Sequence, residues 1–98
     1  MIRVYKNNDK VIIKGHANYA DYGKDIVCAS VSSIVITTVN GILEIDREAI
    51  TYVEEKDILT IEIIKKDEVI IKLINNMMNL LTELSDNYPK NIKIGKDE

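Results

Sequence analysis

The stretch that decides the fold is DIVCASVSSIVITTVNG, residues 25–41. Its many β-branched side chains would suit a strand, but it is too long for one. Residues suited to one helical face recur at spacings of three and four: Val27, Val31, Ile34, Val35 and Thr38. Asp25 can cap the start and Asn40-Gly41 the end, so we predict a helix over residues 25–40 that is buried on most sides.

Short β-branched runs on both sides of this helix predict two hairpins. The first pair of runs is IRVYK (2–6) and VIIKG (11–15), and the second is AITYVEE (49–55) and ILTIEIIKK (58–66). Turn-forming residues separate the runs of each pair: Asn7-Asn8-Asp9 and Glu55-Lys56-Asp57. Successive side chains of a strand point to opposite faces of the sheet, so one face of the second hairpin can carry a set of apolar side chains: Ile50, Tyr52, Ile61 and Ile63.

A second helix is predicted in DEVIIKLINNMMNLLTELSDNY (67–88), because its apolar residues form one stripe opposite polar ones. The stripe consists of Ile70, Leu73, Ile74, Met77, Leu80, Leu81 and Leu84. Pro89 stops the helix, and NIKIG (91–95) adds a last short strand. The order β-β-α-β-β-α-β predicts a single α+β domain over residues 1–98, a two-layer sandwich of an antiparallel-rich mixed sheet and two helices.

The composition argues against several classes of protein. With 16 acidic and 13 basic residues the formal net charge is −3, which lacks the concentrated positive charge that nucleic-acid binding requires. We expect no stretch of the roughly 18 to 20 apolar residues that a membrane span needs. The N-terminus has no signal-peptide pattern, so the chain should be cytoplasmic. One Cys and one His fall short of a closed zinc site, so no metal or cofactor is expected.

Cys28 and His16 are the single cysteine and the single histidine of the chain. Cys28 falls in the first turn of the predicted helix, where unpaired backbone N–H groups favour thiolate over thiol. The N–H groups of Cys28 and Ala29 can also stabilise an oxyanion. His16 follows the second strand and can take the thiol proton as general base. The pair indicates a cysteine hydrolase, although a core cysteine and a solvated histidine are the more common case.

Three neighbouring features each have two interpretations. Asp25 either orients the imidazole or only caps the helix. Ser32, one turn after Cys28, either hydrogen-bonds near the site or bonds to a backbone carbonyl of its own helix. The segment HANYADYG (16–23) is typical of a loop, and its tyrosines Tyr19 and Tyr22 either contact a substrate or lie on the surface.

Two parts of the sequence together resemble a known family. Gly15-His16-Ala17, followed by a short loop that ends at Gly23, and then DIVCASVS (25–32) are similar to the motif of the ribosomal-processing cysteine proteases, the Prp family. In that family a GHA sequence precedes a D-I/L-V-C-A sequence with a serine after it. The length and the order of elements in the chain are compatible with the family over essentially the whole sequence.

The resemblance implies a small cytoplasmic bacterial endopeptidase that acts as a homodimer. It would remove a short N-terminal extension from a large-subunit ribosomal protein, with Cys28 as nucleophile, His16 as its base and Asp25 as orienting residue. The family's substrates are cut beside a phenylalanine, which calls for an apolar pocket near Cys28. The resemblance also implies a loop that moves to admit and cover the peptide, here with Tyr19, Tyr22 and Gly23.

A noncatalytic dimeric module that binds a ribosomal or other basic protein through its acidic face is the alternative. A thiol sealed in the core, or an imidazole far from the thiol, would favour the module. Dimerisation itself has some support in the sequence, since the first helix is more apolar than one sheet-facing stripe requires. The adjacent Met77 and Met78 either meet another subunit or fill gaps in the core.

Overall fold

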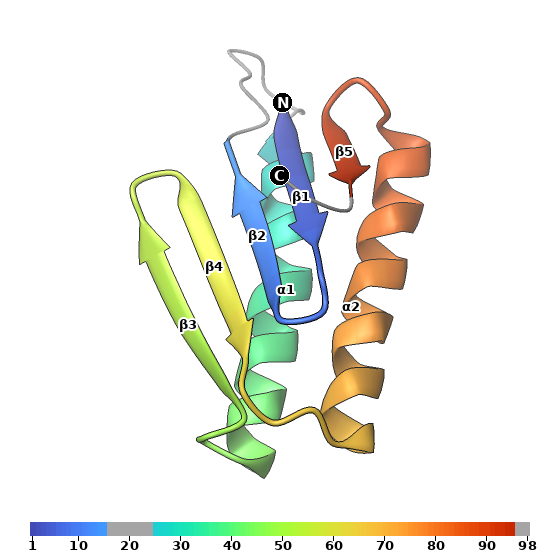
Figure 1. Cartoon of the computed structure of the whole chain (residues 1–98). Coiled ribbons are helices and arrows are strands. Elements are labelled where there is room, and N and C mark those ends of the chain that lie inside the picture. Colours follow the sequence, from blue (N-terminus) through green and yellow to red (C-terminus); the bar gives the residue numbers. More distant parts are fainter. Residues whose placement is uncertain (16–24, 96–98) are drawn as a thin grey trace.

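The computed structural model describes residues 1–15 and 25–95 of the chain (Figure 1). In this part the elements follow the predicted order. They are β1 (Ile2–Lys6), β2 (Lys10–Lys14), α1 (Asp25–Ile45), β3 (Ile50–Glu55), β4 (Ile58–Ile63), α2 (Glu68–Asn87) and β5 (Ile92–Gly95). Both predicted hairpins, both helices and the short last strand are confirmed.

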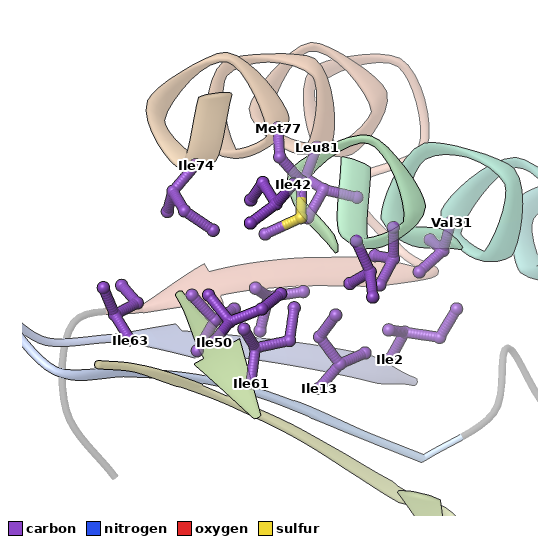
Figure 2. Packing of buried hydrophobic residues seen from close by; sticks show 14 of the residues in the cluster. Ile2, Ile13, Val31, Ile42, Ile50, Ile61, Ile63, Ile74, Met77 and Leu81 are labelled. Carbon is purple, nitrogen blue, oxygen red and sulfur yellow. The ribbon is translucent and has the colours of Figure 1, made fainter. Parts of the chain in front are cut away.

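The strands form one mixed sheet in the order β3-β4-β2-β1-β5. Neighbouring strands are antiparallel, except that β1 and β5 run parallel. Both helices lie on the same face of the sheet, and the buried side chains of the strands point toward them (Figure 2). The predicted α+β sandwich of two layers is therefore confirmed.

The second hairpin closes through a two-residue loop. Lys56 adopts a left-handed backbone conformation with φ of 53°, which reverses the chain between β3 and β4. The register that follows pairs Ile50 with Ile63 and Tyr52 with Ile61. All four side chains are buried or partly buried within the core cluster, so the face predicted for this hairpin is confirmed.

α2 is buried on one side, as predicted. The side chain of Asp67 caps its start by accepting the backbone N–H of Ile70 at 3.2 Å. The buried stripe consists of Ile70, Ile74, Met77 and Leu81. Met77 is fully buried, which confirms its interpretation as a core residue. Leu80 was predicted in the stripe but is 40% exposed, because it lies on the flank that borders a groove between α1 and α2.

α1 ends later than predicted. The helix continues through Asn40 and Gly41 to Ile45 instead of ending at Asn40-Gly41. Ile42 explains the extension, since its side chain is fully buried in the core. Burying an isoleucine gains roughly 1.5 to 3 kcal/mol, which outweighs the roughly 1 kcal/mol that a glycine costs inside a helix.

α1 is also buried on one side only, whereas we predicted burial on most sides. The buried stripe consists of Val27, Val31, Val35, Val39 and Ile42. Ile26, Ile36 and Ile45 remain 50%, 46% and 59% exposed. The stretch Ile26–Ile45 is long and apolar enough to cross a membrane by length and composition, so the expectation that no stretch is long enough is wrong. One such helix is weak evidence for a span, because core helices pass the same test.

Ion pairs join separate segments at the end of the sheet where β4 leads into α2. Lys65 Nζ lies 2.9 Å from Asp46 Oδ2, just after α1, and Lys66 pairs with Asp9 in the β1–β2 turn. The side chain of Asn7 orders the same turn by accepting the backbone N–H groups of Asp9 and Lys10. These contacts are exposed, so each contributes little to stability.

Candidate active site

A cavity of ≈ 140 Å³ lies between the first half of α1 and the sheet. α1 contributes Cys28, Val31, Ser32, Val35 and Ile36 to its wall. The sheet contributes side chains from β1, β2 and β4, together with Gly15, Tyr52, Glu54 and Asp57. Because most of the wall is apolar, the cavity suits an apolar side chain, and Cys28 lines it.

Cys28 is the fourth residue of α1 and therefore lies in its first turn, as predicted. Its side chain is partly buried: it packs against the core and also lines the cavity. A helix start carries about half a positive charge, which favours a negative group placed there. The thiol is thus positioned at the cavity rather than sealed in the core.

Gly15 forms the cavity wall at the end of β2, and the site requires a glycine there. Its φ is 86°, a conformation that other residues rarely adopt. A Cβ atom at this position would lie 2.7 Å from the carbonyl oxygen of Met1. The N–H of Gly15 donates to the carbonyl of Asp57 at 2.9 Å, which joins the end of β2 to the β3–β4 turn. The chain is thereby fixed directly before His16.

The remaining predicted site residues of α1 divide between its faces. Ser32 is exposed and lines the cavity with Cys28, as the spacing of one turn predicted. Ala29 instead lines the groove between α1 and α2. The helix begins at Asp25, so Asp25 is its first residue rather than the one before it. In such a helix the backbone N–H of Ala29 bonds to the carbonyl of Asp25.

Tyr52, Glu54 and Asp57 are wall residues that the sequence did not identify as part of a site. Tyr52 and Glu54 are two positions apart on β3, so both side chains lie on the face toward α1. Burial raises the pKa of Tyr52, and the nearby carboxylate of Glu54 raises it further. The alternation of side chains along β3 indicated that Tyr52 faces the core side of the sheet. Nothing in the sequence indicated that this face of β3 borders the same cavity as Cys28.

The other predicted site residues, His16, Tyr19, Tyr22 and Gly23, lie outside the described residues. Their roles stay predictions. Within residues 1–15 and 25–95, no group of three or more His, Cys, Asp and Glu side chains is arranged to hold a metal ion.

Comparison with known proteins gives consistent matches over most of the chain. A family model described as cysteine protease Prp matches residues 1–93. The ribosomal processing cysteine protease Prp of Mycoplasma genitalium is 28% identical over 107 residues, which cover 99% of this chain and 97% of that protein. The enzyme of the same name from Staphylococcus aureus is 31% identical over 87 residues, covering 86% and 82%.

Solved structures share the fold. Prp from S. aureus in complex with a covalently linked product peptide superposes with a TM-score of 0.84 at 23% identity, over 98% of this chain and 97% of that one. Its complex with a substrate peptide gives 0.81 at 23% identity, over 97% of each chain. The family match covers nearly every residue of both layers, and we conclude that this chain is a cysteine protease that belongs to the Prp family.

Proposed function

We propose that this cysteine protease is an endopeptidase that removes a short N-terminal extension from a large-subunit ribosomal protein. The relatives are named as ribosomal processing enzymes. Structures of the S. aureus enzyme contain a substrate peptide or a covalently linked product peptide. Both observations support a peptide substrate taken from a ribosomal protein.

One observation carries the proposed mechanism: Cys28 lines a mostly apolar cavity at the start of α1. The cavity offers space for an apolar side chain beside the bond to be cut, which suits a cut beside a phenylalanine. Gly15, to which His16 is covalently bonded, lines the same cavity. This supports the pairing of Cys28 as nucleophile with His16 as general base.

The proposed reaction has two steps. The sulfur of Cys28 attacks the scissile carbonyl carbon while His16 accepts the thiol proton, and His16 then gives this proton to the departing amine. The product is a thioester between Cys28 and the N-terminal fragment. A water molecule, deprotonated by His16, attacks the thioester and releases the fragment as a carboxylic acid, while the thiol regains its proton.

Residues around the pair have supporting roles in this proposal. Asp25 orients the imidazole, and Ser32 lies beside the thiol on the cavity wall. The developing oxyanion accepts hydrogen bonds from the backbone N–H groups of Cys28 and Ala29. Because the N–H of Ala29 also serves the helix, it would be shared between two acceptors, an arrangement that is common at helix ends.

The remaining parts of the proposal follow the resemblance. Tyr19, Tyr22 and Gly23 belong to a loop that contacts the bound peptide. The enzyme works as a homodimer in the cytoplasm, where ribosomes are assembled, and needs no cofactor. It acts on the protein before assembly and does not itself bind nucleic acid or a membrane.

The alternative of a noncatalytic module loses support. A thiol sealed in the core would have favoured it, whereas Cys28 lines a cavity. The family to which the chain belongs is also one of proteases.

The test is incubation of the purified protein with large-subunit ribosomal proteins that carry an N-terminal extension. Mass spectrometry should find one cut that releases the extension, and Cys28→Ser should abolish it. Ser33→Ala is the matched control, because Ser33 lies on the opposite, α2-facing side of α1 and should leave the cut unchanged. If the Cys28→Ser protein cleaved the extension to the same extent as the wild type, the mechanism would be contradicted.

A further inference from the structure

β3 is an edge strand that borders the cavity. It pairs with β4 on one side and lies at the end of the sheet order (Figure 1). The strand at the opposite edge, β5, is shorter, at four residues, and packs against α2. β3 has six residues, and among the described residues no segment pairs with its outer side.

The register shows which backbone groups of β3 point outward. The N–H of Ile63 donates to the carbonyl of Asp9 at 2.7 Å, so the backbone of Ile63 faces away from β3. In an antiparallel pair the inward and outward positions alternate. Ile63 is opposite Ile50, and therefore Ile50, Tyr52 and Glu54 direct their N–H and C=O groups to the outer edge. Thr51, Val53 and Glu55 bond to β4.

Two of the outward residues also form the cavity wall. The side chains of Tyr52 and Glu54 line the cavity that Cys28 lines. A chain that hydrogen-bonded to their backbone would run along the rim of this cavity. Side chains at every second position of such a chain would lie on the same face as Tyr52, toward the cavity.

We propose that the substrate binds in an extended conformation as an additional strand beside β3, hydrogen-bonded to the backbone of Tyr52 and Glu54. The proposal rests on the proposed function in one respect, that the ligand is a peptide cut at Cys28. Main-chain pairing of this kind supplies affinity, while the cavity selects one side chain.

The occupant is a peptide rather than a second copy of the chain. Ile36 and Ile58 are 46% and 43% exposed at the cavity, so apolar surface is available where a bound peptide would lie. A second copy paired along β3 would place its own strand across this entrance. Charged side chains on an edge strand, here Glu54 and Glu55, also disfavour pairing of that edge with another copy.

The test compares Glu54→Pro with Glu54→Ala. Both remove the carboxylate, but only proline removes the outward N–H, and proline is tolerated at an edge position whose N–H faces solvent. We expect kcat/KM for the extended ribosomal protein to be about five- to tenfold lower in Glu54→Pro than in Glu54→Ala, the effect of one lost hydrogen bond. The thermal midpoints of the two variants should be similar.

A second measurement uses the wild-type enzyme with synthetic extension peptides that carry one N-methyl group at successive positions. Each methyl group removes one donor, so kcat/KM should fall at alternate positions only. Equal effects of Glu54→Pro and Glu54→Ala, together with a scan without alternation, would overturn the proposal. A change of oligomeric state in Glu54→Pro, read by sedimentation equilibrium, would assign the edge to a second copy instead and would also overturn it.

Failure of the proposed function gives a different result. If the wild-type enzyme cuts none of the extended proteins or peptides, both proposals fall. If it cuts them and the cut is insensitive to the proline and to the methyl scan, only the strand pairing falls.

Discussion

The two helices are nearly equal in length and differ in what they do with their surface. α2 separates apolar from polar residues and buries one stripe, with Asp67 capping its start. α1 buries a similar stripe and exposes three isoleucines, Ile26, Ile36 and Ile45, whereas α2 exposes Val69 and Leu80. Both pack on the same sheet face, so the demands of the core alone do not explain the difference (Figure 2).

Two of the three exposed isoleucines of α1 lie at the cavity or at the groove between the two helices. Residues 26–36 of α1 carry Cys28 and Ile36 on the cavity wall, while Ile26 and Ile34 line the groove toward α2. A helix that only supports a core needs one apolar stripe. The comparison indicates that α2 is mainly structural and that α1 combines a structural stripe with the proposed nucleophile and the apolar surface beside it.

The largest expected effect tests whether Cys28 at the start of α1 acts together with His16. Cys28→Ala and His16→Ala should each lower kcat/KM by more than about a thousandfold, and the double variant should be no worse than Cys28→Ala. Groups that act as a unit are not additive, because removing one already removes the function of the other. Cleavage kinetics of the three variants would measure this, and fully additive losses would show that the two residues act separately.

The next largest effects are expected from replacing one isoleucine in each helix, which compares their contributions to stability and to substrate binding. Ile74→Ala on α2 removes a fully buried side chain and should lower the free energy of unfolding by about 2 to 5 kcal/mol with little change in kcat/KM of the folded enzyme. Ile36→Ala on α1 should cost less than about 1 kcal/mol, since the side chain is already 46% exposed, but should raise KM. Urea denaturation and steady-state kinetics would be recorded for both. Equal changes of stability and of KM in the two variants would show that the helices do not differ in role.

A smaller effect compares the two helix starts. Asparagine caps a helix about as well as aspartate, so Asp67→Asn should change neither stability nor activity. Asp25 is the first residue of α1 rather than its cap, so Asp25→Asn should cost at most about 1 kcal/mol by removing a negative charge from the helix start. It should lower kcat by at least about tenfold, because an amide cannot stabilise an imidazolium as a carboxylate does. Thermal denaturation and pH profiles of kcat separate the outcomes. If Asp25→Asn retains full activity, Asp25 has no orienting role.

The smallest effect concerns Asp46, which immediately follows α1. The hydrogen bond from Lys65 holds the pKa of Asp46 below its ordinary value of 3.8. The folded protein therefore binds this proton less readily than the unfolded chain. The resulting stability is present above the unfolded pKa and is lost as the pH falls through the folded one.

Asp46→Asn should remove this contribution and flatten the loss of stability between about pH 5 and pH 2. The measurement is denaturation at several pH values, with added salt as a control because the pair is exposed. An unchanged pH profile in Asp46→Asn would show that the pair contributes nothing.

Much of this structure could be predicted from local patterns. The hairpins follow from turn residues between β-branched runs, and α2 follows from its stripe. The end of α1 could not be predicted in this way, since Asn40-Gly41 is a good local stop signal. Burial of Ile42 by the rest of the fold overrides that signal.

The candidate site also has parts that the sequence predicts and parts that it does not. The position of Cys28 in the first turn of a helix could be predicted, because it depends only on where the helix begins. The contribution of Tyr52 and Glu54 to the same cavity could not be predicted, because they are distant from Cys28 in sequence. The register of β3 with β4 and the packing of α1 bring them to the cavity wall.

The sequence by itself determined the order of the elements, the amphipathic face of α2 and the place of the single thiol at a helix start, because these depend on interactions between residues near each other in the chain. Only the tertiary structure decided the length of α1, the wall of the cavity and the edge position of β3. These depend on which distant surfaces are brought together, and burial at such contacts outweighs the local preferences of the residues that make them.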